Sequence, residues 1–332
     1  MSSASSIKQG WHNLIERNIV MQFIDVTLRG CAQVMFQNNP LTGLLFFMAI
    51  FLGGYLENLP YIGFACLFAT VIATLTAYIS KIDLASLRSG LYGYNACLVG
   101  VALPTFLDNT PLLWFTIALG SIVSVIATLS LADFLKSWKV AALTAPFVLV
   151  TWTILLASYA FFAIKGIALP KADLSQQYID ASSQSVDYLQ QFTPDIFRGI
   201  SEVFLFSSVA VGIIFVAGLA VSSIWAALFA IFGSLLAYMT ASLLQADFVN
   251  IHTGLYSFSA VLTAIALGST FNKPSLRVAI YTVIGVIFTV FVQGALDTAL
   301  APIGIPTLTM PFVLATWLFL VPNKDLMPQD RQ

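Results

Sequence analysis

The stretch LTAPFVLVTW at 143–152 decides the fold, because LTMPFVLATW at 308–317 repeats it. Eight of the ten positions are identical, and the two stretches lie 165 residues apart. Each contains a proline, which lacks a backbone N–H and fits the first turn of a helix. Thr144 and Thr309 then stand where the N-cap of such a helix is expected. The motif leaves two roles open for each threonine: it caps its helix, or it lines a path.

Two further matches extend this repeat. RGCAQV from Arg29 corresponds to RGISEV from Arg198, and GLYGYNACLVGVAL from Gly90 corresponds to GLYSFSAVLTAIAL from Gly254, at offsets of 169 and 164 residues. Three matches in the same order at nearly constant spacing indicate one unit written twice. The predicted divisions are a polar N-terminal tail, a first repeat, a polar extramembrane linker, a second repeat and a C-terminal tail, at 1–19, 20–169, 170–191, 192–321 and 322–332.

The composition is that of a membrane protein. Hydrophobic residues make up 59% of the chain and charged residues 9%, against about 25% charged in soluble domains. A spanning helix needs about 20 mostly apolar residues, and the short alternating segments of a β-barrel are absent. The sequence therefore predicts an all-α polytopic protein whose main partner is the lipid bilayer. The apolar runs lie at 41–56, 61–79, 111–132, 140–164, 203–221, 224–244, 277–296 and 308–321.

Each half has room for five or six membrane segments. An odd number of crossings would invert the second half relative to the first, and inverted repeats commonly enclose a path near the membrane midplane. Lys8 and Arg17 favour a cytoplasmic N-terminus. The glycine-punctuated segments 90–104 and 254–268 are predicted to be broken or re-entrant. The alternative is two ordinary spans whose small residues allow close helix packing.

Gln33 and Glu202 occupy equivalent positions, four residues after the start of each Arg-Gly motif. A polar side chain within the membrane is costly and usually marks a substrate path. Both side chains present oxygen acceptors, and Phe36, Tyr94 and Phe258 could supply flat walls. Such a slot suits a small, planar, neutral molecule rich in N–H donors. An alkali cation would need several oxygens to replace its hydration shell.

These residues, together with further motifs, resemble those of a known family. The sequence resembles the urea transporter family through NPLTG at 39–43, GLYGYN at 90–95, LVG at 98–100 and the two LT-x-PF phrases. The likeness covers about residues 20 to 320. It implies a homotrimer in the cell (inner) membrane with one urea pore per protomer and no cofactor. It also implies two inverted halves, each of five spans plus a tilted half-spanning helix, with both termini cytoplasmic.

The resemblance also assigns roles by position. Gln33 and Glu202 match the acceptors at opposite ends of the family's filter. Leu205 stands symmetric to Phe36, between two phenylalanines, so whether Leu205, Phe204 or Phe206 lines that side stays open. The narrow middle of the filter is matched by Leu98, Leu262, Thr144 and Thr309, and its aromatic wall positions by Phe36, Tyr94 and Phe258.

Other functions are less well supported by the residues. A channel for ammonia or another small neutral amide is one alternative, although His12 and His252 form no obvious twin-histidine pore. For a water channel, nothing in the sequence resembles paired NPA boxes. An ion-coupled transporter would need a proton carrier such as Glu202 or Asp297. An intramembrane enzyme would need a nucleophile–base constellation or a metal spacing, and neither is seen. Net charge is −1, so no basic face suggests nucleic acid. The three cysteines show no paired spacing and are expected to be buried and inert.

Overall fold

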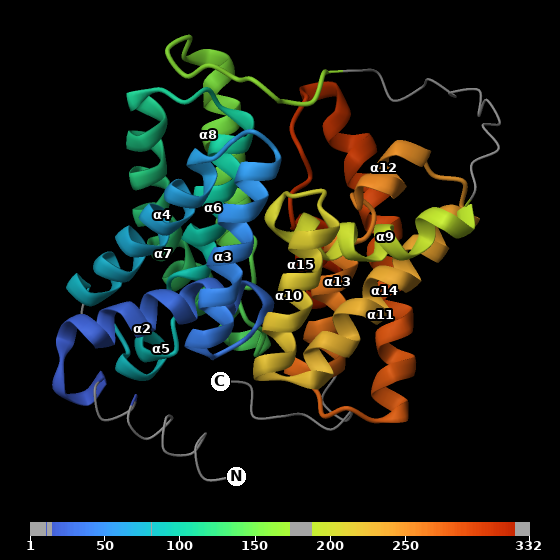
Figure 1. Ribbon diagram of the computed structural model, residues 1–332, viewed down its shortest axis with the longest axis horizontal. Coiled ribbons are helices and arrows are strands. Elements are labelled where there is room, and N and C mark those ends of the chain that lie inside the picture. Colours follow the sequence, from blue (N-terminus) through green and yellow to red (C-terminus); the bar gives the residue numbers. More distant parts are fainter. Residues whose placement is uncertain (1–10, 12–14, 81, 173–187, 323–332) are drawn as a thin grey trace.

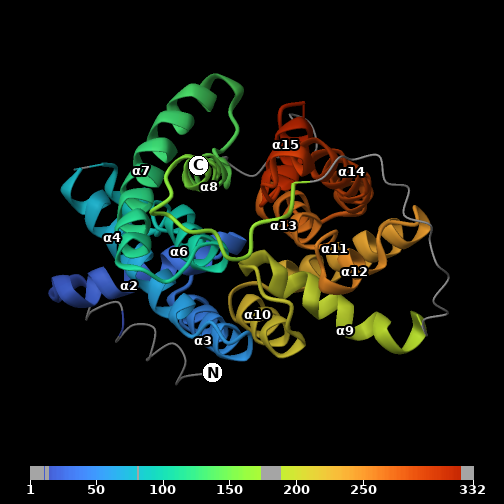
Figure 2. The ribbon, with the colours of Figure 1, turned by 90° about the horizontal axis from the view of Figure 1, so that it is seen from above.

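The computed structural model describes residues 11, 15–80, 82–172 and 188–322, and these are almost entirely helical. Apart from isolated bridge residues, among them the pair Leu107 and Gly166, this part of the chain contains no β-strand. The halves lie side by side, blue to green and yellow to red (Figures 1 and 2). The first contains α2 (Ile19–Ala32), η1 (Gln33–Met35), α3 (Pro40–Leu56), α4 (Tyr61–Ile79), α5 (Leu84–Arg88), α6 (Tyr94–Phe106), α7 (Pro111–Leu135), η2 (Lys136–Trp138) and α8 (Ala145–Ala160).

The second half repeats this order. It contains α9 (Tyr188–Ser201), η3 (Glu202–Phe204), α10 (Val209–Ser222), α11 (Ile224–Leu243), α12 (Phe248–Thr253), α13 (Phe258–Ile265), η4 (Ala266–Thr270), α14 (Leu276–Leu300), η5 (Ala301–Ile303) and α15 (Met310–Leu320). The segment η4 is a turn of π-helix, which has no counterpart after α6.

The backbone itself is duplicated, down to its left-handed residues. Phe36 and Leu205 have φ of 62° and 60°, and Leu143 and Leu308 have φ of 52° and 50°. A leucine or phenylalanine rarely adopts positive φ, and the cost is of order 1–3 kcal/mol each. The same strained conformation at equivalent positions therefore marks turns that both halves need.

The first of these turns bends each half sharply. Helix axes change direction by 74° between 19–35 and 40–56, and by 75° between 192–204 and 209–222. After the left-handed residue, Asn39 and Ser208 restart the chain as N-caps that accept from the amides of Leu41 and Val211. The segment that enters each bend, α2 or α9, is amphipathic, so it does not stand out as an apolar run in the sequence.

The sharp bends thus lie outside 90–104 and 254–268, the two segments that the sequence predicts to be broken or re-entrant. These segments form the short apolar helices α6 and α13. Helix α6 continues through Pro104 to Phe106 rather than ending at the proline. Pro104 lies so near the helix end that only the last turn has to accommodate it. Both segments contain helices too short to cross a bilayer alone, but the sharp bends lie at 36–39 and 205–208.

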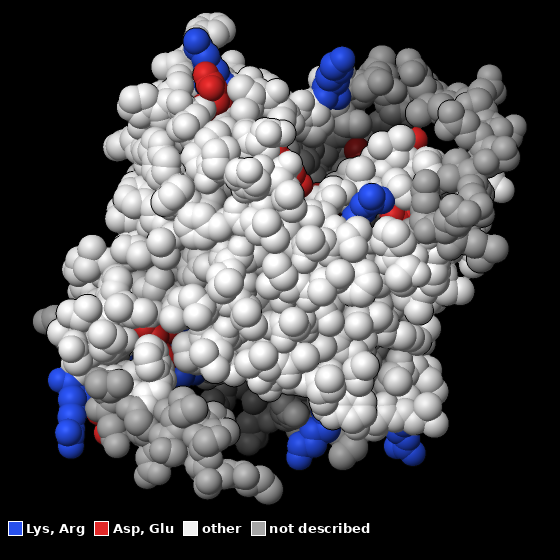
Figure 3. All heavy atoms as spheres, viewed as in Figure 1, with Lys and Arg blue, Asp and Glu red and all other residues white. Residues whose placement is uncertain are grey.

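Within the described residues, four helices are long and apolar enough to cross a bilayer alone: α4, α7 extended through Trp138, α11, and α14 extended through Ile303. Counting each bent pair as one span gives up to six. The remaining apolar helices, α6, α8, the 258–270 segment and α15, have 10–17 residues. Figure 3 agrees with a membrane setting, because charged side chains gather toward the two ends of the visible face, with a broad uncharged band between them.

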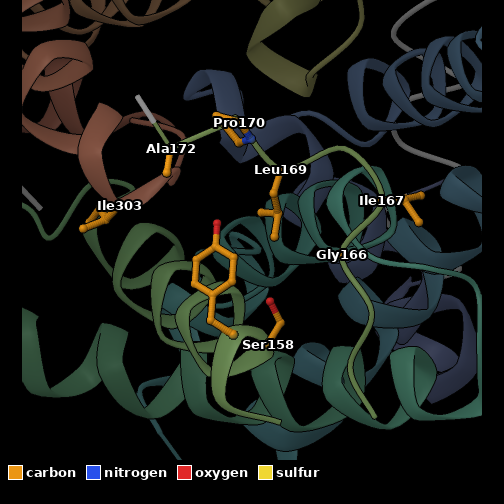
Figure 4. A pocket seen from close by; sticks show the side chains of 8 residues that line it. Ser158, Gly166, Ile167, Leu169, Pro170, Ala172 and Ile303 are labelled. Carbon is orange, nitrogen blue, oxygen red and sulfur yellow. The ribbon is translucent and has the colours of Figure 1, made fainter. Parts of the chain in front are cut away.

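The described residues cover only the two ends of the predicted 170–191 linker. Pro170 lies against Gly304 of the second half, and α9 starts at Tyr188, inside the predicted 170–191 segment. Residues 173–187 lie outside the described residues, as do most of the two tails. A cavity of about 580 Å³ lies beside this crossing (Figure 4). None of the predicted site residues lines it; its walls are Ser158, Tyr159, Gly166, Ile167, Leu169, Pro170, Ala172 and Ile303.

Helices α2 and α3 pack so closely that only glycine fits between them, and α9 and α10 do the same. A Cβ added to Gly43 would overlap the carbonyl oxygen of Leu28, and one added to Gly212 would overlap that of Phe197. The positions correspond in pairs at an offset of 169. Both contacts are made by backbone, which cannot rotate away.

Replacing either glycine by alanine is therefore expected to destabilise the protein by about 3 kcal/mol or more, since overpacking normally costs 1–3 kcal/mol and here the backbone must move. Gly294→Ala is the matched control, because nothing lies within 4 Å of a Cβ there. Thermal melting of the purified variants measures the difference. A Gly43→Ala or Gly212→Ala protein as stable as Gly294→Ala would contradict this packing.

Candidate functional site

The two repeated phrases meet at their threonines. Thr144 Oγ1 and Thr309 Oγ1 lie 2.6 Å apart, from opposite halves of the chain. Each residue is only 2% exposed. Each stands at the N-cap of its helix, α8 or α15, yet neither side chain makes a capping hydrogen bond. Of the two roles left open by the sequence, side-chain capping is therefore the wrong one, and the hydroxyls are directed at each other.

Two tryptophans fasten this contact. Trp152 Nε1 donates to the carbonyl of Pro306 at 2.8 Å, and Trp317 Nε1 donates to the carbonyl of Ala141 at 2.9 Å. Each bond crosses between the halves, and each reaches the loop that precedes the opposite threonine. When one unit contacts another and the partner returns the same contact, the two are related by a two-fold rotation. The threonine pair therefore lies at a pseudo-two-fold axis between the halves.

Tyr94 and its neighbour Asn95, at the start of α6, hold the first threonine's turn. The Tyr94 hydroxyl donates to the carbonyl of Leu143 at 2.6 Å. The side chain of Asn95 accepts from the amide of Phe147 at 3.1 Å and donates to Thr128 Oγ1 at 3.0 Å. In the second half Phe258 and Ser259 occupy these two places, and the phenylalanine has no hydroxyl to donate. The two threonines are thus held by different supports.

The acceptors at the ends of the predicted path also differ. Gln33 Nε2 donates to the carbonyl of Ser89 at 2.9 Å, which orients the amide oxygen the other way. Glu202 is 8% exposed, and no described donor bonds its carboxylate. Its oxygens are not among the fully enclosed atoms without a partner, so a narrow approach to them is open. Gln33 and Glu202 begin η1 and η3, directly before the two bends.

The nearby arginines are already neutralised. Arg29 Nε bonds Asp25 Oδ2 at 2.6 Å. Arg198 Nη1 bonds Asp195 Oδ1 at 2.9 Å and lies 2.9 Å from His252 Nε2. Since each positive charge is paired with its own aspartate, neither is committed to Gln33 or Glu202.

A second carboxylate lies near Glu202. Glu57, directly after α3, accepts from the amide of Ser207 at 2.9 Å and so joins the first half to the second. Burial raises the pKa of the Glu57 carboxyl, and the Ser207 hydrogen bond opposes part of that rise. The two carboxylates are close enough for their charges to repel.

The walls are apolar and partly aromatic. Phe36 meets the rings of Phe271 and Phe312 edge-on, with centroids 5.8 and 6.0 Å apart. Both of those rings belong to the second half, so Phe36 lies at the interface between the halves. Phe258 and the two leucines of the predicted narrow middle are almost fully enclosed, at 3% for Phe258, 1% for Leu98 and 0% for Leu262.

At the position symmetric to Phe36, the three candidate side chains differ in their packing. Phe204 stacks on Phe215 with centroids 4.7 Å apart, and Phe206 fits against Gly53. Both rings are fully buried, whereas Leu205 between them is partly exposed. The left-handed conformation at Leu205 turns the two phenylalanines into the core.

Two kinds of contact in this region could not be predicted from the sequence. The tryptophans of the repeated phrases were visible, but their donation across the interface was not. Cys66 Sγ and Cys97 Sγ lie 3.2 Å apart despite having no paired spacing, and all three cysteines are free and buried. Among the described residues no group of three or more histidine, cysteine or acidic side chains could hold a metal ion.

Comparison with known proteins identifies the fold. Residues 24–324 match the family model described as "UT: Urea transporter". Urea transporter 1 of Ovis aries is 30% identical over 316 residues, covering 93% of this chain and 80% of the sheep protein. Urea transporter 1 of Rattus norvegicus is 29% identical over 328 residues, covering 96% and 83%. The chain belongs to the urea transporter family.

Membership confirms the resemblance inferred from the motifs. This urea transporter is a multi-pass helical membrane protein that passes urea through the bilayer by passive transport, and it is not an enzyme. Ion-coupled transport is not favoured by the comparison.

Thr144→Val and Thr309→Val keep the side-chain shape but remove the hydroxyl. Each variant should reduce urea flux into proteoliposomes about 5–100-fold with folding retained, because an unpaired N–H in a dry site costs about 1–3 kcal/mol. Thr153→Val is the matched control, since Thr153 Oγ1 is exposed and donates to the carbonyl of Leu149, one turn back in α8. Unchanged flux in the Thr144→Val/Thr309→Val protein would assign both hydroxyls to structure alone.

Proposed function

We propose that urea moves along the interface between the two halves, entering beside Gln33 or Glu202 and passing the Thr144–Thr309 pair at the middle. The observation that carries this proposal is the 2.6 Å contact between the two hydroxyls on the pseudo-two-fold axis. A symmetric path between two repeats has its narrowest point where the repeats touch. Here two hydroxyl oxygens lie at that point.

The threonine pair can open without leaving a polar group unmatched. A hydroxyl has one donor proton and two acceptor lone pairs, so the pair bond uses only one proton and one lone pair. When urea enters, one of its N–H groups takes the freed lone pair and its carbonyl oxygen takes the freed proton, so each hydroxyl exchanges a neutral hydrogen bond for another of similar strength. The cost of parting the threonines is thereby offset at the moment of passage.

The apolar side chains beside the proposed path add to its selectivity for urea. Leu98 and Leu262 offer no hydrogen bonds at this level, and the rings of Phe36, Tyr94 and Phe258 are flat. A planar solute can keep its N–H edge on the oxygens and its faces on carbon. An ion would lose its hydration shell without enough replacement ligands, so it is excluded. Leu205 takes the wall position opposite Phe36, where a smaller and more flexible side chain widens the approach to Glu202.

For the protein as a whole we propose two inverted repeats, 20–169 and 192–321, each with five spans and a tilted half-spanning helix. The repeated bends and the pseudo-two-fold contact support this arrangement. Tags at residues 5 and 330 should then lie on one side of the membrane, which we take to be the cytoplasm. A tag between 174 and 186 should lie on the other side. Accessibility of all three tags from the same side would contradict the inversion.

We further propose a homotrimer in the cell (inner) membrane with one path per protomer. The exposed apolar side chains of the helices leave ample surface both for lipid and for contacts between subunits. Mass determination of the detergent-solubilised protein should return three copies. A monomer that transports urea at the full rate per chain would contradict the proposed trimer without contradicting the proposed path.

Glu202 gives the sharpest test of the passive mechanism. Its carboxylate can accept N–H bonds from urea, and charge-assisted bonds are about twice as strong as neutral ones. Gln33 serves at the equivalent place with a neutral oxygen, so Glu202→Gln should keep appreciable flux with weaker binding. Glu202→Leu removes the acceptor and should abolish most of the flux.

The control is to measure both variants in proteoliposomes at two pH values, with glycerol as the comparison solute. A proton-coupled transporter needs a group that titrates, which glutamine cannot supply. If Glu202→Gln is as inactive as Glu202→Leu while both proteins remain folded, the passive mechanism gives way to a coupled one.

A further inference from the structure

The second half lacks the asparagine that braces the first. In the first half Asn95, on α6, uses its amide to join two other elements: the first-turn N–H of Phe147 on α8 and the hydroxyl of Thr128 on α7. Ser259, on α13, occupies the equivalent position and is fully buried. A serine is too short to make both of these bonds at once.

The groups that such a brace would join are present but unpaired. Ser259 Oγ and Gln293 Oε1 are fully enclosed, and neither has a hydrogen-bond partner among the described residues. Gln293 stands at the position of Thr128, and Phe312 at that of Phe147. The N–H of Phe312 lies in the first turn of α15, where no intrahelical acceptor exists. Its N-cap, Thr309, makes no capping bond either.

Helix packing brings Ser259 and Gln293 face to face. A Cβ on Gly285 would meet Leu267, and Thr289 Oγ1 lies 3.0 Å from Thr263 Oγ1. Moving back one turn along α13 thus moves forward one turn along α14, as in an antiparallel pair. One more turn places Ser259 opposite Gln293. The first half shows the same register, where Asn95 bonds Thr128 directly.

These enclosed groups match the hydrogen-bonding requirements of a water molecule. Buried polar groups are rarely left unmatched, and internal waters typically make about three hydrogen bonds to such groups. Here one water could accept from the Phe312 N–H, donate to Gln293 Oε1 and bond to the Ser259 hydroxyl. We propose that Ser259, Gln293 and the Phe312 amide bind one ordered internal water, which replaces the Asn95 side chain in the second half.

This water site braces the turn that carries Thr309. Gln293 Nε2 donates to Thr307 Oγ1 at 2.8 Å and to Asp297 Oδ1 at 3.0 Å. Thr307 lies two residues before Thr309, in the same turn. The first filter threonine is therefore positioned by a covalently attached amide and the second through an exchangeable molecule. This consequence for transport rests on the proposed function, whereas the water site itself does not.

Ser259→Asn tests the site in the full chain. The new amide can accept from the Phe312 N–H and donate to Gln293 Oε1, as Asn95 does for its partners. We expect this variant to melt at a higher temperature than the unmodified protein, and Ser259→Leu to melt at a lower one. A high-resolution structure should show a water between Ser259, Gln293 and Phe312 in the unmodified protein, replaced by the asparagine amide in Ser259→Asn.

The first half provides the matched control. Asn95→Ser should lower the melting temperature, and Asn95→Ser combined with Thr128→Gln should recover part of the loss, because the pair copies the second-half arrangement. The proposal is overturned if the three groups are bonded to one another with no water between them. It is equally overturned if Ser259→Asn is destabilised as much as Ser259→Leu. Urea flux is measured separately: loss of flux in a stabilised Ser259→Asn protein keeps the water site and shows that the turn must yield during transport.

Discussion

The hydrogen bond between Thr144 and Thr309 is the constraint on which the rest of this structure depends. Two hydroxyls from segments 165 residues apart can meet only if both chain turns approach the same axis. The left-handed leucines before each threonine make those turns, and Trp152 and Trp317 hold them from the opposite side. The sequence phrase is written twice because each copy supplies both a threonine to the contact and a tryptophan to fasten the other copy.

The same constraint allows the two halves to diverge elsewhere. At the bend, both halves keep the left-handed residue and the glycine that lets α2 pass α3 and α9 pass α10. Around that shared backbone the side chains differ: Gln33 is neutral where Glu202 is charged, and Tyr94 donates where Phe258 cannot. The proposed path would therefore have two-fold geometry in its backbone but unequal chemistry along its length, and one end would bind urea more strongly than the other.

The sequence was sufficient for the fold class, the duplication and the family, because these depend on composition and on long matches such as GLYGYN. It could not locate the bends. Phe36 and Leu205 carry positive φ without being glycine, and only the packing around them reveals it. It also could not assign Thr144, because an N-cap and a cross-interface contact need the same residue at the same place. Likewise Phe204 and Phe206 differ from Leu205 only through the direction in which the turn points them. Interactions between the halves are long-range, so no local pattern records them.

The most direct test is to join the two threonines covalently. A Thr144→Cys/Thr309→Cys protein with a protease site placed between 173 and 187 should form a disulfide under mild oxidation, since the parent oxygens lie 2.6 Å apart. The cleaved halves should then stay linked until reduced, and urea flux should be lost on oxidation and restored by reduction. Thr309→Cys alone is the control, because all three native cysteines lie in the first half. Halves that separate without reductant, or a linked protein that still conducts urea at the full rate, would show that the path does not pass between these threonines.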